Sequence, residues 1–111
     1  MPFRNLPTEA AEPLASLIDA RPGQVSSMSL TRVGDALGAT LLAFSEGESV
    51  SEERYPGDAL YYLVEGAAKI RFAEDGREVA LAAGDVLRVP AGVEHAVEPT
   101  CATKLLQLVL A

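Results

Sequence analysis

The side chains of this sequence that could do acid–base or ligand chemistry lie in two short stretches. The single histidine, His95, lies in RVPAGVEHAVEP, residues 88–99. A neutral imidazole exchanges protons near neutral pH and also binds transition metals. The second stretch, SEERYPGDALYYLVEG (51–66), holds Glu53 and all the tyrosines of the chain. Because a histidine beside a carboxylate is suited to general acid–base catalysis, His95 is the candidate catalytic residue and Glu53 its candidate partner.

Strand alternation predicts which of the neighbouring side chains share a pocket with Glu53. Residues two apart lie on the same face of a strand, so Tyr55 and Tyr61 should face the side of Glu53, and Tyr62 the opposite side. Gln107 interrupts the apolar face of the last predicted strand. Burying an unpaired amide costs ~1–3 kcal/mol, so this glutamine should find a hydrogen-bond partner or line a wet cavity. We predict a pocket lined by Glu53, Tyr55, Tyr61, His95 and Gln107.

Each of these residues also has a structural interpretation. His95 can be a buried residue whose ring nitrogens hydrogen-bond Glu53 or a backbone carbonyl. Glu53 belongs to the acidic run SEGESVSEE, which is typical of a solvated face. Tyr61 can be a core residue and Tyr62 an interface residue, as tyrosines often are.

After residue 24 the sequence reads as short strands separated by turns, which indicates an all-β domain. Turn signals recur about every 8 to 12 residues, the spacing of a sandwich or barrel. Asp75-Gly76 predicts a tight hairpin, because this dipeptide readily adopts the positive φ angles that such a turn requires. The predicted strands are 25–33, 39–45, 59–64, 67–72, 77–82, 85–90, 95–99 and 103–110.

Residues 1–24 are predicted to form an N-terminal arm with a short helix, ahead of a barrel domain at 25–111. Leu14, Leu17 and Ile18 have helical spacing, and Pro13 suits a first-turn position. The later stretch LYYLV is apolar on both faces, so its outer face should meet a second layer, an arm or a partner subunit. A homodimer is the interpretation we favour.

Composition restricts the partners and the compartment. With 9 Lys+Arg against 16 Asp+Glu, the formal charge is −7, which repels nucleic-acid phosphates and anionic membranes. Cys101 is the only cysteine, so an intrachain disulfide is excluded. The beginning of the sequence lacks the layout of a signal peptide, and no apolar run approaches the ~20 residues of a membrane span. We expect a cytoplasmic protein without nucleic-acid or membrane partners.

The turns of the sequence resemble the two motifs of the cupins. Gly84, five residues, Pro90-x-Gly92, two residues and His95 match the second motif, G-x5-P-x-G-x2-H-x3-N, up to its histidine; Pro99 replaces its asparagine. The stretch 51–66 resembles the first motif, H-x-H-x3-E-x6-G, in its PGD, its aromatic-aliphatic strand and its closing Glu65-Gly66. The resemblance spans about residues 38 to 110 and implies a double-sheet jelly-roll barrel.

The resemblance also implies a metal site whose ligands are mostly replaced here. It places Glu53, Tyr55 and Ala59 on the two histidines and the glutamate of the first motif. Phenol and alanine contribute little or nothing to binding of a transition metal. We therefore expect no tightly held cofactor. A weak divalent-metal site at Glu53 and His95, completed by water or substrate, stays open, and Ala59 joins the predicted pocket on the resemblance alone.

Three functions follow from these residues. The first is a small-molecule-binding barrel without catalysis. The second is a metal-independent epimerase-like or isomerase-like enzyme that uses His95 as general acid or base, with Glu53 tuning it and a tyrosine on the opposite side. The third is a metal-dependent dioxygenase or isomerase with an atypical Glu53/His95 site. We favour the first, with an unknown small molecule as the partner.

Overall fold

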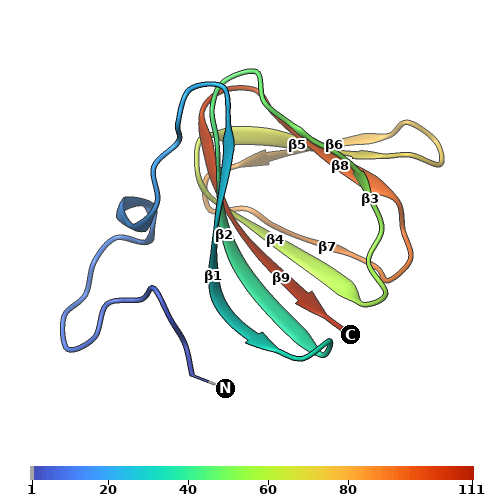
Figure 1. Ribbon diagram of the computed structural model, residues 1–111. Helices are drawn as coiled ribbons and strands as arrows, with labels where there is room; N and C mark the ends of the chain where they lie inside the picture. Colours follow the sequence, from blue (N-terminus) through green and yellow to red (C-terminus); the bar gives the residue numbers. More distant parts are fainter. Residues whose placement is uncertain (1) are drawn as a thin grey trace.

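The computed structural model describes residues 2–111, and this part of the chain folds into two antiparallel sheets that face each other (Figure 1). The five-stranded sheet has the order β1-β2-β9-β4-β7, and the four-stranded sheet has the order β3-β8-β5-β6. The all-β prediction and the jelly-roll arrangement are confirmed. The strands are β1 (Val25–Val33), β2 (Leu37–Phe44), β3 (Val50–Glu53), β4 (Asp58–Glu65), β5 (Ala67–Phe72), β6 (Glu78–Ala82), β7 (Val86–Val89), β8 (His95–Pro99) and β9 (Thr103–Leu110).

Most strands lie within a residue or two of the predicted ranges, but β3 was missed. Its sequence VSEE falls in the acidic run and shows no apolar alternation of its own. The strand is defined by its pairing with β8, where Val50 lies opposite Val97 and Glu53 opposite His95. Tertiary pairing therefore creates a strand that local pattern does not reveal.

The predicted hairpin at Asp75-Gly76 is present and joins β5 to β6. Gly76 has φ 72°, and the side chain of Asp75 accepts a hydrogen bond from the backbone N–H of Arg77 at 3.0 Å. The register is antiparallel, with Arg71 opposite Glu78. The local turn chemistry was sufficient to find this connection.

The main core lies between the two sheets, with a second apolar layer on the outer face of the five-stranded sheet. Along β9, Leu105 and Val109 belong to the inner cluster, whereas Leu106 and Leu108 belong to the outer one. This is the alternation that the sequence predicts. The largest fully buried side chains are Tyr61, Phe44, Leu41, Leu63, Ile70, Leu105 and His95.

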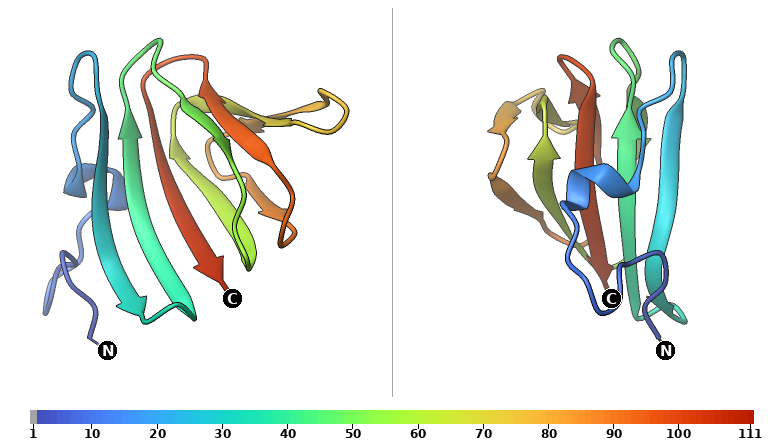
Figure 2. Two further views of the ribbon diagram at one scale, coloured as in Figure 1. Left: turned by 45° about the vertical axis from the view of Figure 1, so that its right-hand side comes forward. Right: turned by 90° about the vertical axis from the view of Figure 1, so that its left-hand side faces the viewer.

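The N-terminal arm covers part of that outer layer. Its helix is a single 3-10 turn, η1 (Leu14–Leu17), and it lies across the outer face of the sheet (Figure 2). The turn is shorter than predicted: Pro13 precedes it, and Ile18 is already extended, with φ −142°. A segment this short has little helical stability of its own, so its packing on the sheet decides its length.

A lysine fixes the arm to the sheet. Nζ of Lys104, on β9, donates a hydrogen bond to the backbone carbonyl of Ala15 at 2.6 Å and lies 3.7 Å from the carboxylate of Glu65. The arm is therefore one of the coverings that the two-sided apolar strand LYYLV led us to expect. In the part of the chain that the structure describes, no helix has the length and apolar character needed to cross a membrane.

Candidate functional site

The two motif stretches are tied together by the turns that precede their site residues. Asp58 accepts a hydrogen bond from the backbone N–H of Ala91 at 2.9 Å and another from Nε of Arg88 at 2.7 Å. The Arg88 guanidinium, helped by the Ala91 N–H, lowers the pKa of the Asp58 carboxyl below its usual value. The N–H of Gly92 donates to the carbonyl of Tyr55 at 2.8 Å. These bonds place Tyr55 next to the turn that leads into His95.

The glycine of the PGD stretch is required by a close approach of the backbone. A Cβ on Gly57 would lie 2.1 Å from the carbonyl oxygen of Leu110, at the end of β9. Only glycine fits at this distance, because the neighbouring atom belongs to backbone. Gly57 therefore holds the start of β4 against β9, the strand that carries Gln107.

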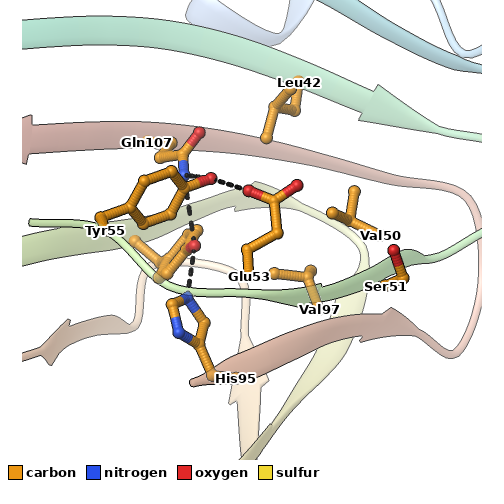
Figure 3. Close-up of a pocket in the computed structure, with 9 residues that line it drawn as sticks. Leu42, Val50, Ser51, Glu53, Tyr55, His95, Val97 and Gln107 are labelled. Atoms are coloured by element: carbon orange, nitrogen blue, oxygen red, sulfur yellow. Dashed lines mark hydrogen bonds between the residues drawn. The ribbon is translucent and has the colours of Figure 1, made fainter. Parts of the chain in front are cut away.

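His95 forms hydrogen bonds through both ring nitrogens. Its Nδ1 lies 2.9 Å from the carbonyl oxygen of Val93, and its Nε2 lies 2.8 Å from the hydroxyl oxygen of Tyr61 (Figure 3). A carbonyl can only accept, so Nδ1 carries the proton; in the neutral ring Nε2 then accepts from the Tyr61 hydroxyl. The His95 side chain is 2% exposed. Its partners are thus a backbone carbonyl and a tyrosine, and Glu53 is not among them.

Gln107 connects this pair to Glu53. Its Nε2 lies 3.0 Å from the hydroxyl oxygen of Tyr55 and 3.2 Å from that of Tyr61, and the Tyr55 hydroxyl donates to Oε2 of Glu53. Both tyrosine hydroxyls already donate their protons, so only their acceptor sites remain for Gln107. The amide must therefore present its NH2 group, with one N–H for each tyrosine. Figure 3 shows the continuous chain from Glu53 through Gln107 to His95.

Burial keeps the hydroxyls of Tyr55 and Tyr61 protonated, as the hydrogen bonds that link Glu53 to His95 require. Desolvation, followed by the neighbouring Glu53 carboxylate, raises the pKa of Tyr55 to about 12. Desolvation, followed by the neighbouring Tyr55, raises the pKa of Tyr61 still further. Both phenols are protonated at neutral pH, so both can donate to their partners.

These side chains line a cavity of about 90 Å³ inside the barrel. Of the predicted pocket residues, Ala59 is the one that does not line it: Ala59 is buried in the core on β4, two residues from Tyr61. The apolar wall was missed. Alternation along β2 could have revealed Leu42, whereas Val50 and Ser51 belong to the undetected strand β3. The lining consists of Leu42, Val50, Ser51, Glu53, Tyr55, Tyr61, His95, Val97 and Gln107.

The structure also places Tyr61, Tyr62 and Glu53, for which the sequence allowed purely structural roles. Tyr61 is a core residue that also faces the cavity. Tyr62 lies on the outer face and is 37% exposed. Glu53 belongs to the acidic run, yet it is half-buried and turned toward Tyr55, whereas its neighbour Glu52 pairs with Arg71 at 3.0 Å.

The donor atoms of the cavity do not fit a tightly held transition metal. In the neutral ring, Nε2 of His95 accepts a hydrogen bond from the Tyr61 hydroxyl, the Tyr55 phenol is neutral, and the methyl group of Ala59 offers no ligand. Among strong ligands for a transition metal Glu53 alone remains, and metals of this kind need several. Within residues 2–111, no three His, Cys, Asp or Glu side chains are grouped so that they could hold a metal ion.

The fold and the motif turns define a cupin-type barrel, and comparison with known families agrees. The model of the cupin domain family matches residues 40–106. This chain therefore belongs to the cupin family. A search of curated proteins gave no match.

Solved structures include relatives that span the whole chain. A cupin superfamily protein from Desulfitobacterium hafniense is 45% identical, with 99% of this chain and 98% of that chain covered and a TM-score of 0.93. A cupin 2 conserved barrel domain protein from Leptotrichia buccalis is 30% identical over 88% of this chain and 46% of that one, with a TM-score of 0.81. A Streptococcus pyogenes protein of unknown function is 24% identical over 99% and 94%, with a TM-score of 0.90, and shows the fold alone.

Proposed function

We propose that this protein binds a small molecule through a hydrogen-bond-donating head group in the barrel cavity, without a tightly held metal and without catalysis by His95. The observation that carries the proposal is the donor-to-acceptor direction of the hydrogen bonds around Gln107. Its Nε2 hydrogens go to Tyr55 and Tyr61, and the tyrosine protons go to Glu53 and His95. The N–H and O–H donors of Gln107, Tyr55 and Tyr61 are therefore all used in hydrogen bonds within this group.

This group of hydrogen-bonded side chains still has acceptor oxygens without a hydrogen-bond partner. Within the described residues, neither Oε1 of Glu53 nor Oε1 of Gln107 receives a hydrogen bond, and no buried side-chain polar atom lacks a partner, so neither oxygen is fully buried. Glu53 adds a negative charge. A site of this kind favours a hydroxyl or, because of the charge, an ammonium group.

The size of the cavity limits what enters it. A dry protein cavity of about 150 Å³ binds benzene, so a cavity of about 90 Å³ holds a head group of a few atoms. The apolar wall formed by Leu42, Val50 and Val97 suits the carbon atoms that carry such a group.

Binding is favoured over acid–base chemistry because His95 has no free nitrogen. A general acid or base must come within hydrogen-bond reach of the proton that it transfers. Here Nδ1 is bonded to Val93 and Nε2 to Tyr61, and the ring is nearly sealed from solvent. A ligand in the cavity would have to displace the Tyr61 hydroxyl from a buried contact before it could bond to Nε2 of the imidazole.

The experiment is a titration of the isotope-labelled protein with small probes, followed by NMR at the Gln107 side-chain amide. Ethanolamine and ethylene glycol carry donor groups, whereas acetate carries only acceptors. We expect both donor probes to shift the Gln107 resonance and acetate to leave it unchanged. Glu53→Gln should weaken ethanolamine binding, and Glu52→Gln, on the same strand but paired outward with Arg71, should not. Binding of acetate at this site, or no response to either donor probe, would overturn the proposal.

A further inference from the structure

A second hollow, of about 420 Å³, adjoins the barrel cavity. The two share Tyr55 and Gln107 as part of their walls. This outer cleft lies over the inner face of β2 and β9, between the turn that joins β1 to β2 and the segment Tyr55-Pro56. Its volume is within the ~300–1,000 Å³ typical of small-molecule sites. Its lining consists of Arg32, Gly34, Asp35, Leu37, Gly38, Thr40, Tyr55, Pro56, Gln107 and Val109.

Gly38 keeps this cleft open. It lies inside β2, with Arg32 opposite on β1 and Val109 opposite on β9. A Cβ at Gly38 would meet no atom within 4 Å, and its φ is not in the left-handed region. Neither packing nor backbone geometry therefore requires glycine here. A glycine in a strand interior weakens the strand and often marks a place where a ligand approaches the backbone closely.

Arg32 supplies a positive charge beside that glycine. Residues directly opposite in adjacent strands share a face of the sheet, so Arg32 and Gly38 face the same side. The guanidinium lies 3.9 Å from the carboxylate of Asp35, and both side chains are exposed. An exposed ion pair at this distance is weak, so Arg32 is free to bind an anion. Guanidinium and carboxylate form strong, often bidentate hydrogen bonds.

We propose that the outer cleft is the second half of the ligand site and that the ligand is a short linear carboxylic acid with an amino or hydroxyl group at its other end. The donor group enters the barrel cavity beside Glu53, the carbon chain passes Tyr55 and Gln107 over Gly38, and the carboxylate meets Arg32. The carboxylate of Glu53 inside and the guanidinium of Arg32 outside, which is only weakly paired with Asp35, complement the two ends of such a molecule. This inference rests on the proposed function, because its inner half is the same cavity.

The test compares γ-aminobutyrate, which has both ends, with n-butylamine, which lacks the carboxylate. Dissociation constants are measured by calorimetry for the folded wild type and variants. We expect the amino acid to bind about two- to fivefold more tightly, the gain expected of one exposed charge pair. Gly38→Leu should remove that advantage by filling the cleft, and butylamine binding should persist. Arg32→Gln should remove it as well, whereas Arg21→Gln, which changes an arginine of the arm, should not.

The outcomes separate the two proposals. If butylamine binds but γ-aminobutyrate has no advantage, or keeps its advantage in Gly38→Leu and Arg32→Gln, the inference about the cleft is wrong and the proposed function stands. If neither amine binds the wild-type protein, the proposed function fails and the inference fails with it. Thermal unfolding of Gly38→Leu checks that the variant is folded, as the open space around Gly38 leads us to expect.

Discussion

The hydroxyl oxygen of Tyr61 lies 2.8 Å from Nε2 of His95, deep in the barrel, and with Nδ1 donating to the Val93 carbonyl the neutral ring accepts a hydrogen bond from this hydroxyl. This contact uses the nitrogen that a metal or a substrate would otherwise engage. The other nitrogen is held by Val93. In the function that we propose, His95 has a positioning role: it orients Tyr61, which accepts a hydrogen bond from Gln107 and directs that amide toward the cavity.

Replacement of His95 by glutamine separates this role from catalysis. His95→Gln keeps an amide acceptor but loses the ring geometry that joins the Val93 carbonyl to the Tyr61 hydroxyl, so we expect the free energy of unfolding to fall by about 1 kcal/mol. Ethanolamine should still bind the folded variant, because Glu53 and the Gln107 oxygen remain. Denaturant unfolding and an NMR titration measure the two effects. Loss of binding in a folded variant would mean that His95 contacts the ligand.

Stability should fall at alkaline pH through the buried tyrosines. The pKa of Tyr55 is raised by burial to about 12, whereas a tyrosine in the unfolded chain ionises near about 10. Between these values the unfolded state binds fewer protons than the folded state, so the stability is fully present below pH about 10 and is lost as the pH rises toward 12. Thermal unfolding across this range measures the loss. It should be smaller in Tyr55→Phe; an equal loss in that variant would contradict the assignment to Tyr55.

Lys104 should control how firmly the N-terminal arm is held. Lys104→Met removes the donor to the Ala15 carbonyl while keeping an apolar stem of similar length. We expect faster cleavage by chymotrypsin after Leu14 or Leu17 in an otherwise folded barrel, because the arm detaches more often. Lys69→Met is the control, since Lys69 pairs with Glu78 on the other sheet. Equal cleavage rates in the Lys104 variant and the wild type would show that the lysine does not hold the arm.

Pairing of two copies stays a prediction. The arm leaves apolar side chains exposed on the outer face, among them Val86 at 59% and Tyr62 at 37%. We expect analytical ultracentrifugation to give the mass of a homodimer and Val86→Lys to shift it toward the monomer. Val33→Lys, at the far edge of the sheet, is the control. A monomer at high protein concentration would contradict the prediction.

Local pattern predicted more of the fold than of the site. Period-two alternation and turn residues were enough for β1, β5, β8 and β9, and alternation placed Leu105 and Leu106 on opposite faces. The strand β3 could not be found in this way, because its acidic sequence becomes a strand only through pairing with β8. The side chains near the cavity were indicated by residue type.

How those side chains are connected depended on geometry that a sequence does not contain. Glu53 lies directly opposite His95 in the register, yet the hydrogen bonds that connect their side chains run through Tyr55, Gln107 and Tyr61. Side-chain direction decides this, and residue spacing does not. Gly38 was missed for a related reason: within a strand a glycine indicates weakness, and only the surrounding structure shows the open space that it preserves.

The most direct test of the account is the dissociation constant of ethanolamine for the wild type and for Glu53→Gln, measured by NMR at neutral pH and constant ionic strength. We predict that ethanolamine binds the wild type, that the Gln107 amide reports the binding, and that Glu53→Gln weakens it by about tenfold or more through loss of a charge-assisted contact. Equal affinity in the two proteins would contradict it.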